Sequence, residues 1–188
     1  HDTPVSSVTP GTRAALNITG TDRAERGVML AGPDSFGTTM RFLGTLRTVR
    51  SLDEELSGRG AFHLHVGSGS WPIRLRVIRP ATSGEVCLIR LDTPIPLRCG
   101  DHFILRETGR RAVVGGGVVL DPHPPRGGEE LRAAIPLLLA ASEKDRDAIA
   151  SALLTIRGTA LLEDLARDSG GGVPHSDFRS GSSVMAEH

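Results

Sequence analysis

Residues 61–78, AFHLHVGSGSWPIRLRVI, hold the side chains with the clearest potential for chemistry. His63 and His65 are two positions apart, so on an extended strand both imidazoles point to one face. Such a pair could begin a metal site, act in catalysis, or lie on the rim of a β-barrel that contacts nucleic acid. Arg74 and Arg76 show the same spacing and alternate with apolar residues. The choice depends on what the chain places beside this segment.

A zinc site would need a third and a fourth ligand besides the two histidines. Cys99 and His102, on a later predicted strand, are the candidates for them. The residues show no local ligand signature, and the two cysteines, Cys87 and Cys99, lack C-x-x-C spacing. We therefore expect no metal site, no disulfide framework and a reduced, cytosolic setting.

A catalytic pair would need a nucleophile, and the sequence contains neither a G-x-S-x-G nor an S-x-x-K motif. A small hydrolase that uses His63 or His65 thus lacks its partner residue. The run VVGGGVV at 113–119 lacks G-x-G-x-x-G spacing, and no P-loop pattern occurs. We expect no catalysis and no bound nucleotide. Glycines inside a strand instead predict a bulge or a close approach of two backbones.

Arginine supplies almost all of the positive charge, since Lys144 is the sole lysine. The chain is neutral overall, but residues 1–121 hold 15 arginines against 12 acidic residues. Arg74 and Arg76 share a strand face, and Arg106 on a neighbouring strand would share it too. These side chains either are simply solvated or clamp a phosphate backbone with their planar guanidinium groups.

The segments that must position these side chains are short, rich in β-branched residues and broken by Gly, Pro and Asp. This pattern predicts an antiparallel barrel or sandwich up to residue 121. No run approaches the length of about 20 apolar residues that spans a membrane. The expected strands are 12–18, 28–30, 40–49, 61–66, 72–79, 85–91, 102–107 and 112–120.

Helical periodicity begins only after the Pro/Gly-rich linker DPHPPRGG at 121–128. We expect a first helix from residue 129 that Pro136 kinks or splits, and a second from about residue 143 to Gly158. A third helix should end at the glycines that follow ALLEDLARDS. Short helices with short connections suit a helix-turn-helix or winged-helix unit. Residues 170–188 show no periodicity and predict a disordered tail.

Two stretches resemble a known family. PGTRAALNITG…ERGVML at 10–30 resembles the second domain of translation factors of the elongation-factor-Tu class. FHLHVGSGSWPIRLRVI and CLIRLDTPIPLRCGDHFILRETGRRAVVGGGVVLDPHPPR resemble the third domain of the selenocysteine-specific elongation factor. That family shows R-x-G-D-R-F-x-L-R before V-G-G-G-x-V-L-D-P, and His102 stands here where the family usually has Arg. The resemblance covers residues 4 to about 168.

The resemblance implies a mainly β fold of elongation-factor-Tu-like barrels, the first of them incomplete, followed by a small helical segment. The implied divisions are a partial second-domain barrel at 1–33, a third-domain barrel at 34–121, an incomplete winged-helix-like segment at 122–169 and the tail at 170–188.

It also implies a function. Members of the family deliver selenocysteyl-tRNA to the ribosome at recoded UGA codons and bind an mRNA hairpin through their C-terminal domains. GTP and magnesium belong to a GTPase domain that this sequence lacks. We therefore expect a cytoplasmic fragment that contacts tRNA and the ribosome, with no cofactor, metal, membrane contact or catalytic residue of its own.

The family's third domain implies tRNA contacts at His63, His65, Arg74, Arg76 and Arg106. Arg41 is the candidate for the aminoacyl pocket, most of which would lie upstream of His1. The rival interpretation is a non-catalytic β-barrel module that binds another protein.

Overall fold

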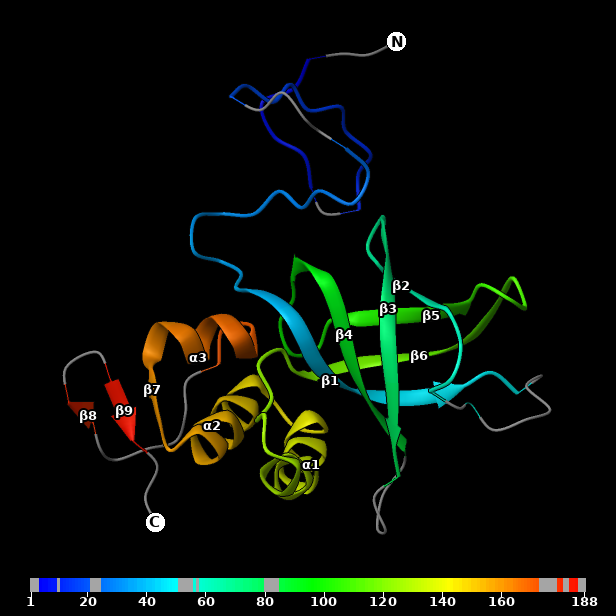
Figure 1. The fold of residues 1–188 in the computed structure, drawn as a ribbon. Helices are drawn as coiled ribbons and strands as arrows, with labels where there is room; N and C mark the ends of the chain where they lie inside the picture. Colours follow the sequence, from blue (N-terminus) through cyan, green and yellow to red (C-terminus); the bar gives the residue numbers. More distant parts are fainter. Residues whose placement is uncertain are drawn as a thin grey trace.

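The computed structural model describes residues 4–9, 11–20, 25–50, 56, 58–79 and 85–172, together with the backbone of 179–180 and 183–185. Its centre is a closed barrel of antiparallel strands in the order β1-β4-β3-β2-β5-β6, with β6 pairing back onto β1 (Figure 1). The strands are β1 Thr38–Thr48, β2 Phe62–Val66, β3 Gly69–Ile78, β4 Glu85–Pro96, β5 His102–Glu107 and β6 Ala112–Asp121. The predicted fold class, a mainly β protein with a small helical segment, is confirmed.

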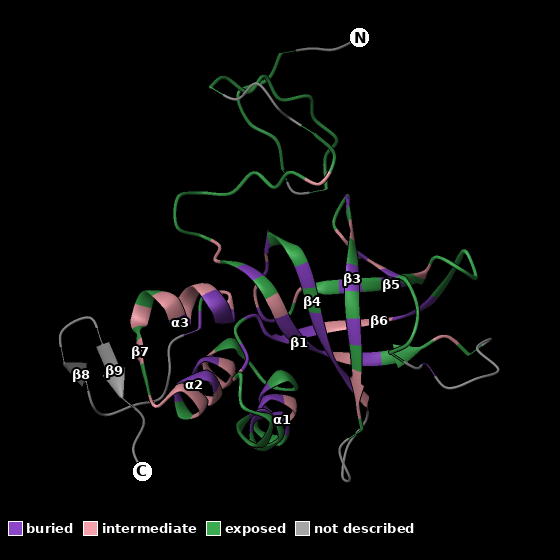
Figure 2. Cartoon of the chain, viewed as in Figure 1, coloured by how far each residue is buried: buried purple, intermediate pink, exposed green. Residues whose placement is uncertain are grey.

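The inside of the barrel is filled by one apolar cluster to which every strand contributes. Buried and exposed residues alternate along β3 and β5, as the two-residue period of a strand requires (Figure 2). At the centre the rings of Phe42 and Phe103 meet edge to face, with centroids 5.5 Å apart. The fully buried side chains inside the barrel include Phe42, Phe62, Leu64, Ile89 and Leu105.

The glycine run of β6 lets this strand lie close to both of its neighbours. A Cβ atom on Gly115 would come within 2.7 Å of the Arg47 carbonyl oxygen, and one on Gly117 would collide with the carbonyl of Thr45. The β5–β6 register also shifts between Leu105 and Arg106. The prediction that these glycines mark a bulge or a close backbone approach is therefore confirmed.

Three helices cover one side of the barrel: α1 Gly128–Ser142, α2 Arg146–Arg157 and α3 Leu162–Ser169 (Figure 1). The carboxylate of Asp145 caps α2 by accepting a hydrogen bond from the Ala148 amide at 2.8 Å. Gly158, at φ 74°, ends α2 where the sequence predicted it. Pro136 does not split α1, which continues through it to Ser142.

Barrel and helices share a second apolar cluster. On the barrel's outer face, Leu43 on β1 pairs with Leu88 on β4, and both pack against the helices. The helices contribute Leu131, Ala134, Ile135, Leu138, Leu153, Leu154 and Leu165 to this cluster. The apolar contact continues from strand to helix, so the helical unit is packed directly onto the barrel.

A buried ionic network joins the same two parts. Arg157, at the end of α2, lies 3.2 Å from Asp121 at the end of β6 and 2.8 Å from Asp168 on α3. Asp121 is fully buried, and burial raises the pKa of its carboxyl group although Arg157 opposes this. One oxygen each of Asp121 and Asp168 finds no hydrogen-bond partner within the described part of the chain. Both carboxylates share the Arg157 guanidinium, and His123 adds a backbone hydrogen bond to Asp121 at 2.8 Å and a ring nitrogen 3.7 Å from Asp168.

Part of the expected disordered tail forms strands. β7 Thr159–Leu161 pairs with β9 Ser183–Met185, which pairs with β8 Arg179–Ser180, in an antiparallel sheet. β7 offers unpaired backbone groups to a second strand, a long-range pairing that local periodicity does not reveal. The rest of the tail beyond residue 172 lies outside the described residues.

The strands expected at 12–18 and 28–30 are wrong, because the described residues between 4 and 37 form no strand. A hairpin without further strands is marginal in water. The segment instead touches the β2–β3 turn: the Arg26 side chain and the Gly27 amide donate hydrogen bonds to Ser68. Within the described ranges, no helix is long and apolar enough to cross a membrane.

Gly117→Ala should destabilise the barrel by about 1–3 kcal/mol, because the methyl group would meet the Thr45 backbone and force β6 away from β1. Urea unfolding measures the loss. Gly109→Ala is the matched control, since a Cβ atom there meets nothing within 4 Å. Equal stability of the two variants would show that barrel closure tolerates a side chain at Gly117.

Arg157→Met should lower the free energy of unfolding by about 3–5 kcal/mol, because it leaves two buried carboxylates without their cation. Arg132→Met on α1 is an exposed control of the same chemistry and should change stability by about 0.5 kcal/mol or less. Matching urea midpoints for the two variants would mean that the network does not stabilise the fold.

Candidate functional site

Three arginines stand side by side on the outer surface of the barrel. Arg41 on β1 lies directly opposite Arg90 on β4, and Arg90 lies opposite Arg74 on β3. Directly paired residues point to the same face, with Cβ atoms about 4.5–5.5 Å apart. We call Arg41, Arg90 and Arg74 the arginine row. Arg76, two residues beyond Arg74 on β3, points to the same face.

The alternation that exposes these arginines comes directly from the sequence. In β3 the buried Ile73 and Leu75 face the barrel interior and turn Arg74 outward. In β4 the buried Ile89 and Leu91 do the same for Arg90.

The exposed arginines of this face carry positive charge, and one acid, Asp92, lies on the same face of β4 two residues beyond Arg90. Arg74, Arg76 and Arg90 are exposed, and none of them forms an ion pair with the residues that the structure describes. The pKa of Arg41 is lowered, chiefly by burial and then by the charges of Arg90 and Arg126, while Asp121 opposes the shift. Like charges held this close favour an anion on the row.

Arg41 also has a structural contact. Its two terminal nitrogens donate hydrogen bonds to the carbonyl oxygens of Pro124 and Pro125, at 2.7 and 2.8 Å. These prolines belong to the linker that leads from β6 to α1. Arg41 thus anchors the linker to β1, and its place in an aminoacyl pocket stays a prediction.

A second group of polar side chains lies on β2, β3 and β5. His63 is directly opposite Arg106 on β5, and His65 is opposite Ser70 on β3. The Ser70 hydroxyl lies 3.3 Å from His63 Nδ1 and 3.5 Å from His65 Nε2. We call the hollow that they form the histidine pocket; it has a volume of about 340 Å³. Its lining residues are His63, His65, Ser70, Arg106, Glu107, Thr108 and Arg111.

The electrostatics of the histidine pocket favour the neutral imidazole of His65. Burial lowers its pKa first, and the positive charge of Arg106, His63 and Arg26 lowers it further. His65 is therefore an uncharged hydrogen-bonding group near neutral pH in the empty pocket.

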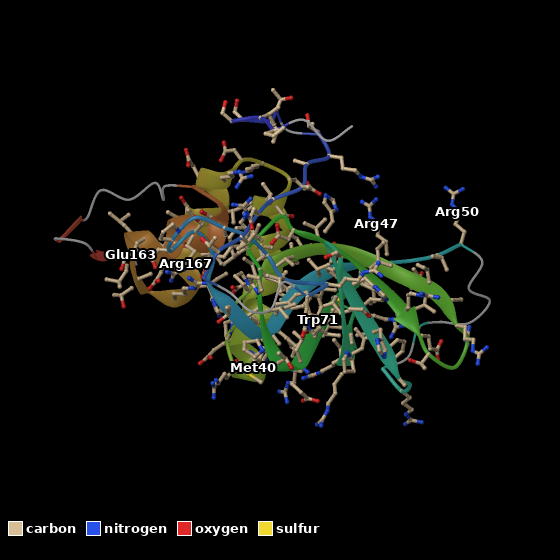
Figure 3. All side chains as sticks on the ribbon, turned by 90° about the horizontal axis from the view of Figure 1, so that it is seen from above. Met40, Arg47, Arg50, Trp71, Glu163 and Arg167 are labelled. Carbon is tan, nitrogen blue, oxygen red and sulfur yellow. The ribbon has the colours of Figure 1, made fainter. Side chains whose placement is uncertain are left out.

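The arginine row and the histidine pocket belong to one face. Pro72 on β3 lies opposite His63, and Arg74 is the next residue along β3 that points the same way. The five predicted tRNA contacts are thereby brought onto the outer face of three adjacent strands. Arg47 on β1 and Arg50 just after it project on the side away from α3 (Figure 3).

Arg90 was missed by sequence reasoning, although it lies between Arg41 and Arg74. Its signal was present, because IRLD at 89–92 alternates apolar and polar residues as IRLR at 73–76 does. What the sequence does not show is the strand register that places Arg90 at the centre of the row.

The structure does not unite the candidate zinc ligands. Cys99 packs in the apolar cluster under the helices, and its thiol donates to the Leu120 carbonyl at 3.0 Å. Burial raises the pKa of Cys99 well above its usual range and that of Cys87 to about 12. No group of three or more His, Cys, Asp or Glu side chains in the described ranges could hold a metal ion.

Comparisons with known proteins find similarity to selenocysteine-specific elongation factors. Residues 45–126 match the sequence model of the β-barrel domain of the selenocysteine-specific elongation factor. A curated selenocysteine-specific elongation factor from Desulfomicrobium baculatum is 29% identical over 128 residues. This match covers 65% of the present chain and 20% of that protein, so the chain spans about a fifth of its relative's length.

One solved structure shares the fold. The bacterial selenocysteine-specific elongation factor EF-Sec aligns with a TM-score of 0.59 and 20% identity, over 81% of this chain and 25% of that chain. At this identity the likeness shows the fold alone. Translation elongation factor SelB from Methanococcus maripaludis, in its apo form, covers 48% of this chain and 24% of that chain at 12% identity. Its TM-score is 0.40.

Arg41→Gln should lower the free energy of unfolding by about 1–3 kcal/mol, because two charge-assisted hydrogen bonds to the linker carbonyls are lost. Arg90→Gln changes a neighbouring exposed arginine of the same row and should leave stability within about 0.5 kcal/mol. Chemical denaturation of both variants checks this. An Arg41 variant as stable as the Arg90 variant would contradict the anchoring function.

Proposed function

We propose that the outer face of this barrel binds selenocysteyl-tRNA, because residues 45–126 match the sequence model of the β-barrel domain of the selenocysteine-specific elongation factor. The observation that carries the proposal is the arginine row, whose exposed members Arg74 and Arg90 have no acidic partner among the described residues. The barrel holds the tRNA and performs no chemistry on it.

The physical basis is phosphate recognition. A guanidinium group presents a planar fork of donors that matches two phosphate oxygens, and it stays charged at any physiological pH. A row of such groups across three strands follows a sugar–phosphate backbone without reading its bases. The face therefore supplies affinity and orientation, while other parts of the factor would select the tRNA.

The wider function of the factor belongs to the same proposal. Delivery of selenocysteyl-tRNA to the ribosome at recoded UGA codons needs GTP and magnesium in a GTPase domain, and an mRNA hairpin bound by C-terminal domains. On this proposal the protein acts in the cytoplasm, where translation takes place. The helical unit, with α3 followed by strands that pair with β7, supports a winged-helix-like segment.

A protein-binding module is the second candidate, and one observation favours it. A hollow of about 830 Å³ lies between β1, β5, β6 and the end of α1. Its lining includes the exposed apolar side chains of Ile104 and Val113 together with Leu139. This hollow is separate from the exposed arginines Arg74 and Arg90, so charge reversal in the row distinguishes the two functions.

The double variant Arg74→Glu/Arg90→Glu should bind tRNA more weakly at every salt concentration. The slope of log affinity against log salt should also become shallower by about 0.7–0.9 for each lost phosphate contact. Fluorescence anisotropy with labelled tRNA over a salt series measures both quantities.

Arg132→Glu on α1 makes the same kind of charge reversal on an exposed residue away from the row and serves as the control. An affinity that does not change with salt would contradict the phosphate mechanism. Equal weakening by Arg132→Glu would show that only the overall charge matters.

A further inference from the structure

The histidine pocket receives a contribution from a distant part of the chain. Arg26 lies in the segment before the barrel, and its Nε donates to the Ser68 carbonyl at 3.1 Å. The Gly27 amide donates to the Ser68 hydroxyl, also at 3.1 Å. These bonds hold Arg26 at the turn between β2 and β3, where its charge acts on His65.

The charged groups around His65 are mostly positive. His63 stands on the same strand, Arg106 on β5, and Arg26 at the turn. The remaining charged residues in the lining are Arg111 and Glu107. The Glu107 carboxylate is already paired with Arg110, at 3.1 Å. The charge of the single acid in the pocket is thus offset before any ligand arrives.

The polar groups are also held in place. Arg106 donates to the Arg111 carbonyl at 3.2 Å, which fixes its guanidinium at the mouth of the pocket. The Ser70 hydroxyl has one proton and two lone pairs, and it lies between two imidazoles. While both imidazoles are neutral, this hydroxyl can donate to only one of them.

We propose that the histidine pocket seats one phosphate group, held by Arg106 and Ser70, and that His63 and His65 take up protons from solvent as the phosphate binds. On the proposed function, on which this inference rests, the phosphate belongs to the backbone of the bound tRNA. A free oxyanion offers the same chemistry and is the other source.

The proton uptake follows from the change in local charge. Burial is the first cause that lowers the pKa of His65, and the charge of the nearby cations is the second. An anion within hydrogen-bond distance reverses this effect, because it stabilises the charged imidazolium and raises the pKa of the ring. Both protonated rings then donate to the Ser70 oxygen, and the hydroxyl proton becomes free to point at the phosphate.

The first experiment measures the affinity for tRNA between about pH 8 and pH 5.5 at constant salt. Affinity should rise as the pH falls, by up to about tenfold per pH unit for each proton taken up. His65→Gln and His63→Gln should each flatten this dependence, because glutamine cannot take up a proton. His102→Gln is the matched control, because His102 is an exposed histidine on β5 outside the pocket.

The second experiment uses sulfate, an oxyanion that does not titrate in this range, and follows the imidazole signals by NMR. Sulfate should raise the pKa of His63 and His65 and leave that of His102 unchanged. Together with pH-dependent tRNA binding, this result assigns the pocket to the tRNA backbone. If sulfate shifts the two histidines but tRNA binding does not depend on pH, the pocket binds a free oxyanion and not a phosphate of the tRNA backbone.

The proposal is overturned if sulfate shifts neither histidine and the His63→Gln/His65→Gln double variant keeps the parent's pH dependence. The salt dependence carried by Arg74 and Arg90 would remain in that case, so the proposed function would stand. Loss of the salt dependence with the sulfate effect intact would count against the proposed function instead.

Discussion

The close approach of β6 to β1 is the constraint on which the rest of the molecule depends. The sheet closes into a barrel only because Gly115, Gly116 and Gly117 carry no side chain where the neighbouring backbones pass. Closure fixes the register of β1, and β1 in turn sets the register of β4 and β3. These registers place Arg41, Arg90 and Arg74 side by side. The glycine run of β6 therefore affects the position of the arginine row without contacting it.

The helical unit is held by two interactions of different character. The apolar cluster supplies most of the driving force, because it removes leucine and isoleucine side chains from water on both partners. The network of Asp121, Arg157 and Asp168 has to overcome the desolvation of three charges, and such networks often stabilise little against an apolar replacement. It does restrict the geometry, since only one orientation of α2 and α3 brings both carboxylates to one guanidinium.

Much of this architecture could be predicted because strand alternation is a local signal. The interior positions of β3, β4 and β5 follow from residues two apart, and Gly158 marks the end of α2 as glycines commonly do. The failures are long-range. Residues 12–18 alternate like a strand but pair with no strand in the part of the chain that the structure describes. The pairing of β7 with β9 spans more than twenty residues. Arg90 likewise needed a register, which no single segment contains.

The arginine row runs along the border of the helical cover. Two residues beyond the Arg41–Arg90 pair, Leu43 and Leu88 are already beneath the helices. The exposed face is therefore bordered by the helices on one side. Arg41 lies at this border, because its guanidinium also donates hydrogen bonds to the linker that leads to α1. A long polyanion bound along this face would meet the helices on one side, so the helical unit limits the directions from which it can approach.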